Sequence, residues 1–293
     1  METNGMLLDG RVAIVTGAGG GLGRAHALFL ARHGARVVVN DLAPDAASQV
    51  AAEIQAAGAT ALAIPASVTD EAGVAAMVRQ VIDQWGRIDV LVNNAGILRD
   101  RTFAKMSLAD FRQVIDVHVM GSVICTKAVW DLMREQRYGR VVMTTSSSGL
   151  YGSFGQANYG AAKMALVGLM QTLALEGEKY GIRVNCLAPT AATQMTRGVL
   201  SEANLERLSP ALVSPGLLAL VVEGAPTRAV LCAGAGHFAR AHVTLTTGRH
   251  LGAGADAGEQ LIEQWEQISD RDGEIVPAYG LVQSEREIAS AGA

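Results

Sequence analysis

The sequence predicts an α/β fold: a single domain built on a doubly wound parallel sheet, with helices on both faces and a C-terminal extension. Short apolar runs alternate with helix-length segments over the first two-thirds of the chain, as they do in βαβ units. A glycine-rich stretch joins the first apolar run to the first helical segment. The length of 293 residues suits one large α/β domain, and 49% hydrophobic residues supply its core.

The alternation can be followed element by element. The run 12–15 is apolar throughout, which is typical of a strand buried on both faces, and Gly34 ends the helix that follows it. The expected strands are 12–15, 36–40, 60–64, 88–92, 140–144 and 182–187. The expected helices are 22–33, 45–57, 71–85, 108–133 (where Gly121 allows a bend) and 159–180.

The last third of the chain is less regular. Pro210, Pro215 and Gly216 mark turns, residues 217–222 predict a helix, and residues 230–233 predict a final strand. From residue 239 onward the alternation fades. Because no linker precedes this stretch, we expect one domain over 1–293, in which 197–293 is a variable portion.

Charge and composition exclude several classes of function. A net charge of −4 without a basic stripe argues against nucleic-acid binding, and no Lys/Arg run suggests a membrane surface. The three cysteines lie far apart and predict neither disulfides nor a metal site. The six histidines show no ligand spacing, so we expect no metal.

The chain shows no targeting pattern. Residues 1–10 lack the apolar run of a signal peptide, and no stretch of roughly twenty apolar residues is present to span a bilayer. The C-terminal Ala-Gly-Ala is not the Ser-Lys-Leu peroxisomal address. We therefore expect a cytoplasmic protein.

The glycine-rich stretch, residues 16–23, reads Thr-Gly-Ala-Gly-Gly-Gly-Leu-Gly. A tight turn needs residues without a Cβ, and glycine lets backbone N–H groups approach a pyrophosphate at the start of a helix. Such a run alone is also typical of a plain loop. Its place between the first strand and the first helix predicts a Rossmann-type dinucleotide site. The predicted contacts are Gly17, Gly21, Leu22 and Gly23.

Asp41 ends the second strand. A carboxylate there accepts hydrogen bonds from the adenosine ribose hydroxyls and repels a 2′-phosphate. The glycine turn holds no Arg or Lys to attract that phosphate, so the sequence predicts NAD rather than NADP. The alternative is a solvated Asp in a turn. Ser67 and Val68 follow the third strand and are predicted to line the adenine.

A second group of residues has a specific spacing. Asn93-Asn94-Ala95-Gly96 follows the fourth strand, Ser146 stands thirteen positions before Tyr159, and Lys163 follows Tyr159 by four. Together with the glycine turn, this set resembles the short-chain dehydrogenase/reductase family over residues 11–196. The resemblance implies cofactor contacts from Asn94, Ala95, Gly96, Tyr159 and Lys163.

The chemistry explains these residue types. Tyr159 and Lys163 share a helix face at i and i+4, and an ammonium lowers the pKa of a nearby tyrosine from its usual value of about 10. Tyr159 can then act as the general acid–base, while Ser146 positions the reacting oxygen and the cofactor carries the hydride. The alternative is an amphipathic helix with a chance Tyr and Lys.

His118 departs from the family pattern. Many members place a fourth catalytic residue, an Asn, at this point of the helix before the Ser strand, and this chain has His118 there. Two interpretations stay open: His118 holds a relay water, or it only packs.

Several stretches resemble one subgroup more narrowly: 93–101, 117–118, 138–140 and 149–159. They are similar to the (3R)-hydroxyacyl-CoA dehydrogenase unit of the peroxisomal multifunctional β-oxidation enzyme and its bacterial stand-alone relatives, which also carry His at the Asn position. By this resemblance Thr193 bonds the nicotinamide carboxamide, in a cofactor loop that includes Pro189. Leu150, Tyr151, Phe154 and 217–222 either line an apolar substrate pocket or pack in the core.

The resemblance implies an NAD-dependent enzyme that interconverts a secondary alcohol and a ketone, a 3-hydroxyacyl-CoA and its 3-oxoacyl-CoA. We accordingly expect 1–293 to be one dinucleotide-binding catalytic domain, in which 197–293 contacts the substrate or another subunit. The alternatives are a hydroxysteroid dehydrogenase and a non-catalytic NAD-sensing protein on the same fold. Its partner would be a small-molecule substrate, with no nucleic acid and no membrane. Apolar helices at 166–175 and 108–133 predict a homodimer or homotetramer.

Overall fold

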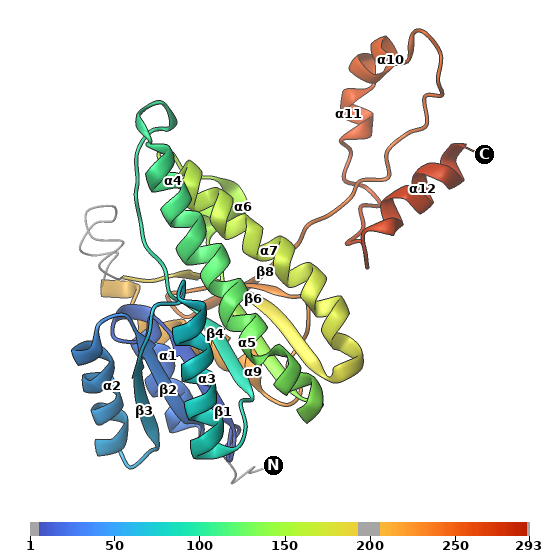
Figure 1. Cartoon of the computed structure of the whole chain (residues 1–293). Coiled ribbons are helices and arrows are strands. Elements are labelled where there is room, and N and C mark those ends of the chain that lie inside the picture. The colour runs from blue at the N-terminus through green and yellow to red at the C-terminus, as the bar shows by residue number, and fades with distance from the viewer. Residues whose placement is uncertain (1–5, 193–205, 292–293) are drawn as a thin grey trace. The chain divides into compact units, whose positions relative to one another are not determined.

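A computed structural model describes residues 6–192 and 206–291, and it confirms the α/β fold (Figure 1). Its centre is an eight-stranded sheet in the order β3-β2-β1-β4-β5-β6-β7-β8. All pairs from β3 to β7 are parallel. The strand order reverses between β1 and β4, and ligands of open α/β sheets bind at the carboxyl end of such a switch point.

Seven strands lie close to their expected positions, and an eighth, β8, was not predicted. They are β1 Val12–Thr16, β2 Arg36–Asp41, β3 Ala61–Pro65, β4 Val90–Asn93, β5 Gly139–Thr144, β6 Ile182–Thr190, β7 Val230–Gly234 and β8 His237–Ala241. Val15 in β1 lies opposite Val39 in β2 and Val92 in β4. Every residue of β1, β4 and β5 is buried, because helices cover both faces of the sheet.

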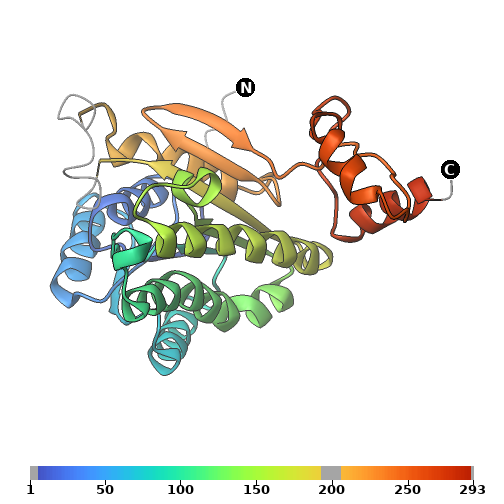
Figure 2. The ribbon, with the colours of Figure 1, turned by 90° about the horizontal axis from the view of Figure 1, so that it is seen from above.

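The helices form two layers. They are α1 Gly21–Arg32, α2 Pro44–Ala56, α3 Glu71–Trp85, α4 Leu108–Ile115, α5 Gly121–Gln136, α6 Ser147–Tyr151, α7 Ala157–Gly177 and α9 Ser214–Val221. The helices α1, α2 and α9 pack one core with β1 and β2, through residues such as Leu30, Ile54 and Leu217. The helices α5 and α7 run side by side on the other face (Figure 2).

Helix α3 shows how local signals set the ends of an element. The Asp70 side chain accepts a hydrogen bond from the Ala72 N–H at its start, and Gly86 takes a left-handed conformation (φ +75°) at its end. The expected bounds of this helix, 71–85, are those observed.

The helix expected at 108–133 is interrupted. A π-helical turn, η2 (Asp116–Met120), separates α4 from α5, so the irregularity begins before Gly121. Gly121 has another role: a Cβ there would lie 2.6 Å from Val68 Cγ2, so glycine lets the segment after β3 approach the helix. π-Helical turns often occur at functional sites.

The chain divides into two compact units, Met1–Arg240 and Ala241–Ala293. The second contains α10 (Ala257–Glu263), α11 (Trp265–Ile268) and α12 (Leu281–Ala291), elements that the sequence analysis did not predict. A backbone bridge joins Leu245 to Ile275, and no described residue of this unit is buried. The interpretation of 1–293 as one catalytic domain stays a prediction.

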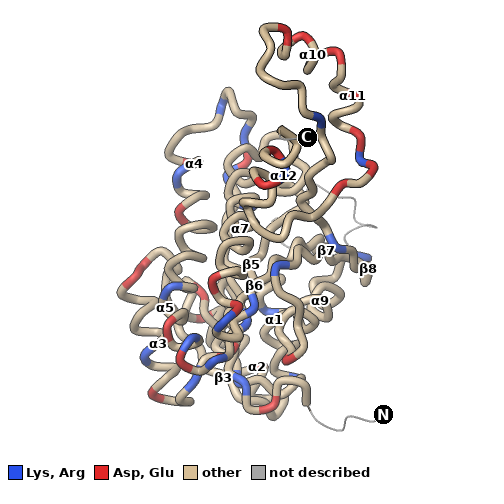
Figure 3. Tube along the Cα trace, turned by 90° about the vertical axis from the view of Figure 1, so that its right-hand side faces the viewer, with Lys and Arg blue, Asp and Glu red and all other residues tan. Residues whose placement is uncertain are grey.

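The described residues show two further features of the whole chain. Basic and acidic residues are interspersed along it (Figure 3). None of the helices described is long and apolar enough to cross a membrane.

Candidate active site

Ser146, Tyr159 and Lys163 meet at the carboxyl end of β5. Ser146 follows β5 and begins α6, while Tyr159 and Lys163 lie in the first two turns of α7. The Lys163 ammonium nitrogen is 5.4 Å from the centre of the Tyr159 ring. Gly149 allows α6 to touch α7, because a Cβ there would lie 2.7 Å from Lys163 Cβ. The structure thus brings the three predicted catalytic residues together.

Burial is the main influence on the pKa values of Tyr159 and Lys163. Burial raises the pKa of Tyr159, a hydrogen bond with Ser146 lowers it, and the charge of Asp100 raises it. Burial also lowers the pKa of Lys163 to about 7. Lys163 Nζ donates to the Thr144 carbonyl oxygen (2.6 Å). The expected lowering of the Tyr159 pKa is not found here, because desolvation of the phenolate outweighs its stabilisation.

His118 is buried in the π-helical turn beside Tyr159. Its ring meets the Tyr159 ring edge-on, with the centres 5.3 Å apart at 86°. Nε2 lies 2.8 Å from the Ile97 carbonyl oxygen and 3.0 Å from the Ile97 N–H, so it donates to the first or accepts from the second, depending on the tautomer. Nδ1 is buried and has no partner among the described residues. The ring packs against Tyr159, and the relay role of His118 stays a prediction that would use Nδ1.

Gly96 makes room for His118. A Cβ at residue 96 would lie 2.2 Å from His118 Cε1, so any side chain there would displace the imidazole. We expect Gly96→Ala to destabilise the fold by about 1–3 kcal/mol in thermal unfolding, as overpacking does. The matched control is Gly224→Ala, at an exposed position after α9, where a Cβ meets nothing within 4 Å. Equal stability of the two variants would contradict this tight contact.

The folding stability is expected to be sensitive to acid, because two of the histidines are buried. Burial lowers the pKa of both His26 and His118 to about 3, and His118 is further lowered by the charge of Lys163. His26 Nδ1 is hydrogen-bonded to Ser214 Oγ (2.9 Å), a contact between α1 and α9. The unfolded chain binds protons at both histidines below about pH 6.5, whereas the folded chain does not until about pH 3.

Folding stability is therefore expected to fall as the pH drops from 6.5 toward 3, by on the order of 2 kcal/mol per histidine at pH 5. Urea unfolding at pH 7.5 and pH 5 measures this difference. His26→Asn should reduce the difference, and His237→Asn, at an exposed position of β8, should leave it unchanged. An equal pH dependence in His26→Asn and the wild type would exclude His26 as a source.

The glycine turn is held against the loop after β4. Asn94 Nδ2 donates to the carbonyl oxygens of Thr16 (2.9 Å) and Gly17 (3.2 Å), and Thr16 Oγ1 accepts from the N–H groups of Asn94 and Ala95. Gly17 has φ +62°, and a Cβ there would lie 2.8 Å from Ala95 Cα. At Gly23 a Cβ would lie 2.2 Å from the Gly17 carbonyl oxygen. Both glycines are therefore required by close backbone approach.

Asp41 lies beside the same turn. Its carboxylate accepts from the Gly19 N–H (2.9 Å) and the Ala43 N–H (3.0 Å). Helix α1 begins at Gly21 without a side-chain cap, so its first N–H groups have no side-chain partner. A glycine cradle, an uncapped helix start and a carboxylate at the end of β2 fit a dinucleotide.

The other predicted cofactor residues are placed as follows. Leu22 is half-buried in the first turn of α1. Ser67 and Val68 follow β3, where Ser67 Oγ is hydrogen-bonded to Thr69 Oγ1 (2.9 Å). Pro189 lies near the end of β6, opposite Ala233 in β7. Thr193 lies outside the described residues.

The predicted pocket residues separate into two groups. Tyr151 and Phe154 are 71% and 93% exposed, so both lie on the surface of the described chain. Leu217 and Leu220 are buried in the core with α1. These two side chains therefore pack in the core rather than line a pocket.

Sequence reasoning missed Asn158, which precedes Tyr159. Its side chain is fully buried. Nδ2 donates to the Arg99 carbonyl oxygen (3.0 Å), and Oδ1 accepts from the Tyr159 N–H (2.7 Å). Asn158 thus joins the start of α7 to the loop after β4. Its only sequence signal was an Asn at a helix start, where capping residues are common.

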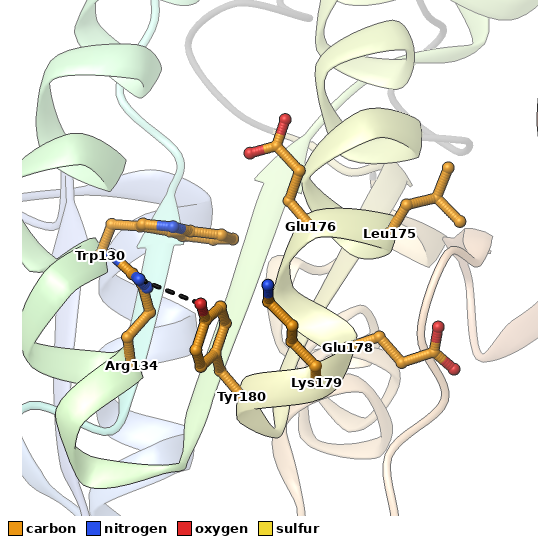
Figure 4. Close-up of a pocket in the computed structure, with 7 residues that line it drawn as sticks. All are labelled: Trp130, Arg134, Leu175, Glu176, Glu178, Lys179 and Tyr180. Carbon is orange, nitrogen blue, oxygen red and sulfur yellow. Dashed lines mark hydrogen bonds between the residues drawn. The ribbon is translucent and has the colours of Figure 1, made fainter.

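A surface pocket lies between the carboxyl-terminal ends of α5 and α7 (Figure 4). It is lined by Trp130, Arg134, Leu175, Glu176, Glu178, Lys179 and Tyr180. Arg134 donates to the Tyr180 hydroxyl (3.0 Å). Because Tyr159 and Lys163 lie at the other end of α7, this pocket is separate from the candidate active site. Among the described residues, no group of His, Cys, Asp and Glu could hold a metal ion.

Comparison with known proteins now adds to this geometry. Residues 11–204 match the family model for short chain dehydrogenase. The chain is 44% identical to a short-chain type dehydrogenase/reductase of Mycobacterium tuberculosis, over 92% of this chain and 98% of that protein. It is 42% identical to peroxisomal multifunctional enzyme type 2 of Drosophila melanogaster, over 92% of this chain but 51% of that enzyme. The chain therefore spans about half of the latter.

Solved structures agree with these similarities. The structure of the full-length Drosophila melanogaster enzyme has a TM-score of 0.81 with 36% identity, over 97% of this chain and 49% of that one. A 7α-hydroxysteroid dehydrogenase complexed with NADH and 7-oxoglycochenodeoxycholic acid has a TM-score of 0.74 with 30% identity, over 80% of this chain and 98% of that one.

Proposed function

The chain belongs to the short-chain dehydrogenase/reductase family, and from this premise we propose that it is an NAD-dependent oxidoreductase that interconverts a 3-hydroxyacyl-CoA and a 3-oxoacyl-CoA. The observation that carries the proposal is the grouping of Ser146, Tyr159 and Lys163 at the carboxyl end of the sheet, next to the glycine turn of a switch point. An acid–base group beside a dinucleotide cradle is the arrangement that hydride transfer to or from a carbonyl carbon requires.

Each residue has a defined task in this proposal. Ser146 hydrogen-bonds the substrate oxygen and orients it toward Tyr159. The Tyr159 hydroxyl gives a proton to that oxygen during reduction and takes it back during oxidation. Lys163 holds the nicotinamide ribose hydroxyls and favours the phenolate when protonated. The nicotinamide, when bound, supplies or accepts the hydride.

The residues proposed to hold the cofactor belong to the glycine turn and to the strand ends beside it. The turn around Gly17 and Gly23 would hold the pyrophosphate at the start of α1, and Asp41 would accept from the adenosine ribose hydroxyls. Asn94, Ala95 and the residues after β3 and β6 would complete the site. The negative charge of Asp41 supports NAD rather than NADP.

The substrate class rests on similarity. Support for an acyl-CoA comes from the 42% identity to the peroxisomal multifunctional enzyme and from the stretches 93–101 and 149–159 that resemble its dehydrogenase unit. The second candidate is a steroid alcohol, which is supported by the structural likeness to 7α-hydroxysteroid dehydrogenase. The expected cytoplasmic location stays a prediction.

The test is NADH absorbance at steady state with the purified protein, NAD, and (3R)- and (3S)-hydroxyacyl-CoA thioesters. A steroid alcohol is included in the same panel. Turnover of one acyl-CoA enantiomer supports the proposal and sets the stereochemistry. Turnover of the steroid alone would favour the second candidate. Tight NADH binding without turnover of any alcohol or ketone would favour a nucleotide-sensing protein and contradict an enzyme.

We further propose that the exposed face of α7 pairs with a second copy of the chain. Between Met164 and Leu175 this helix carries no charged residue, and a helix that is apolar on all sides is normally covered. Its exposed residues there are Met164, Ala165, Gly168, Thr172 and Leu175. The buried Leu166 and Met170, although within the expected interface range 166–175, pack inside their own protomer.

Ala165→Glu is expected to convert the assembly to monomers in sedimentation experiments, because it places a charge in the centre of this face. Ala76→Glu, at an exposed position of α3, is the matched control and should leave the mass unchanged. An oligomer that survives Ala165→Glu would show that another surface holds it together.

A further inference from the structure

Two segments of the chain meet directly before Tyr159. One is the loop after β4, residues 99–101, and the other is the start of α7, residues 155–158. The Arg101 N–H donates to the Gly155 carbonyl oxygen (2.9 Å). Gln156 Nε2 donates to Asp100 Oδ2 (2.7 Å). A parallel bridge between Arg101 and Gln156 completes the contact. The mechanism proposed above uses none of these groups.

The carboxylate of Asp100 carries an uncompensated charge. It takes part in no ion pair in the described part of the chain, and its neighbour Arg99 is paired instead with Asp110 (3.9 Å). Asp100 is also exposed, so water and salt weaken its field without removing it. Among the described residues, its side chain accepts one hydrogen bond, from Gln156, and this bond directs Oδ2 toward the start of α7.

The groups that face Tyr159 can be named from each element packed around it. Lys163 lies on the same helix, with its ammonium nitrogen 5.4 Å from the ring centre. His118 on η2 meets the ring edge-on and is neutral above about pH 3. Ser146 stands at the start of α6 and lowers the pKa of Tyr159. Asp100 is the one anionic side chain among the groups that act on Tyr159.

We propose that Asp100 is a positioning residue for Tyr159: through the hydrogen bond that it accepts from Gln156, it holds the start of α7, and with it the Tyr159 hydroxyl, in place. The same carboxylate also acts on the ionisation of Tyr159. A carboxylate near a phenol disfavours the second negative charge, so the phenol keeps its proton to a higher pH. Asp100 therefore biases Tyr159 toward the proton-donating form that ketone reduction requires. The catalytic part of this inference rests on the proposed function; the ionisation of Tyr159 itself does not.

Two variants separate the hydrogen bond from the charge. Asp100→Asn removes the charge and keeps a side-chain oxygen that can accept from Gln156. Gln156→Met removes the hydrogen bond and keeps the charge. Asp116→Asn is the control, since it makes the same charge change at an exposed position on η2, two residues before His118.

The first measurement needs no substrate. The protein is labelled with ¹³C at the tyrosine ring carbon that bears the hydroxyl, and the Tyr159 signal is identified by its loss in Tyr159→Phe. Asp100→Asn is expected to lower the titration midpoint of Tyr159 by about half a pH unit or more, as removal of a nearby anion does. Gln156→Met and Asp116→Asn should shift the midpoint by less. An unchanged midpoint in Asp100→Asn would overturn the electrostatic half of the proposal.

The second measurement is the pH profile of alcohol oxidation. In Asp100→Asn the limb of kcat/KM that reports Tyr159 should move to lower pH by the same amount. In Gln156→Met, kcat should fall by about threefold to tenfold without movement of that limb, because the acid–base group is displaced. Unchanged kcat in Gln156→Met would overturn the positioning half. If no substrate is turned over, the proposed function fails while the titration still decides the charge effect.

Discussion

Replacing Tyr159 with phenylalanine is expected to lower kcat by about 10³-fold, within the range that general acid–base groups contribute. The substitution removes one hydroxyl and keeps the ring that packs edge-on against His118. The fold and the glycine turn should therefore be unaffected, and the dissociation constant of NADH should stay unchanged. Initial rates and a fluorescence titration with NADH measure the two quantities on one preparation.

Tyr138→Phe provides the matched control. Tyr138 is also buried, but its ring lies between the guanidinium groups of Arg11 (3.7 Å) and Arg140 (4.1 Å), next to the amino end of β5. Loss of its hydroxyl should leave kcat within about twofold of the wild type, as expected of a group outside the chemistry. Substantial activity in Tyr159→Phe would remove Tyr159 from the acid–base role.

The preference for NADH over NADPH is expected to be about 10²-fold in kcat/KM, since a 2′-phosphate would meet the carboxylate of Asp41. The backbone N–H groups of Gly19 and Ala43 hold that carboxylate, so it cannot easily turn away. Asp41→Asn removes the charge and keeps an oxygen that accepts a hydrogen bond. We expect this variant to reduce the preference by about tenfold, through better use of NADPH.

Asp45→Asn is the control for this experiment, because it removes an exposed carboxylate four positions further on, in the first turn of α2. Its preference for NADH should equal that of the wild type. Efficient use of NADPH by the unmodified protein would contradict the prediction, and an equal preference in Asp41→Asn would assign the selectivity to another group.

The parts of the fold that local signals determine could be predicted from the sequence. Helix α3 was placed to the residue because Asp70 and Gly86 mark its ends. Strand β6 was expected to end at residue 187, but it continues to Thr190 because residues 188–190 pair with β7. That pairing joins segments more than forty residues apart, so no local pattern reports it.

The candidate site also has some features that the sequence predicts and others that it does not. The spacing of Ser146, Tyr159 and Lys163 places them together because it follows from one strand end and one helix face. The protonation of Tyr159 could not be predicted, since it depends on burial and on Asp100, which approaches from another segment. Asn158 was missed for the same reason: its partner is the carbonyl oxygen of Arg99.

The glycine turn is held in shape by side chains of the protein itself. The Asn94 side chain holds the carbonyl oxygens of Thr16 and Gly17. Ordering each backbone residue costs roughly 1–2 kcal/mol of conformational entropy, and in a preformed turn that cost falls on folding rather than on binding. Asn94 is therefore expected to influence the entropy of cofactor binding through the turn that it holds. A residue that cannot hydrogen-bond these carbonyl oxygens would leave the turn less ordered and so weaken cofactor affinity.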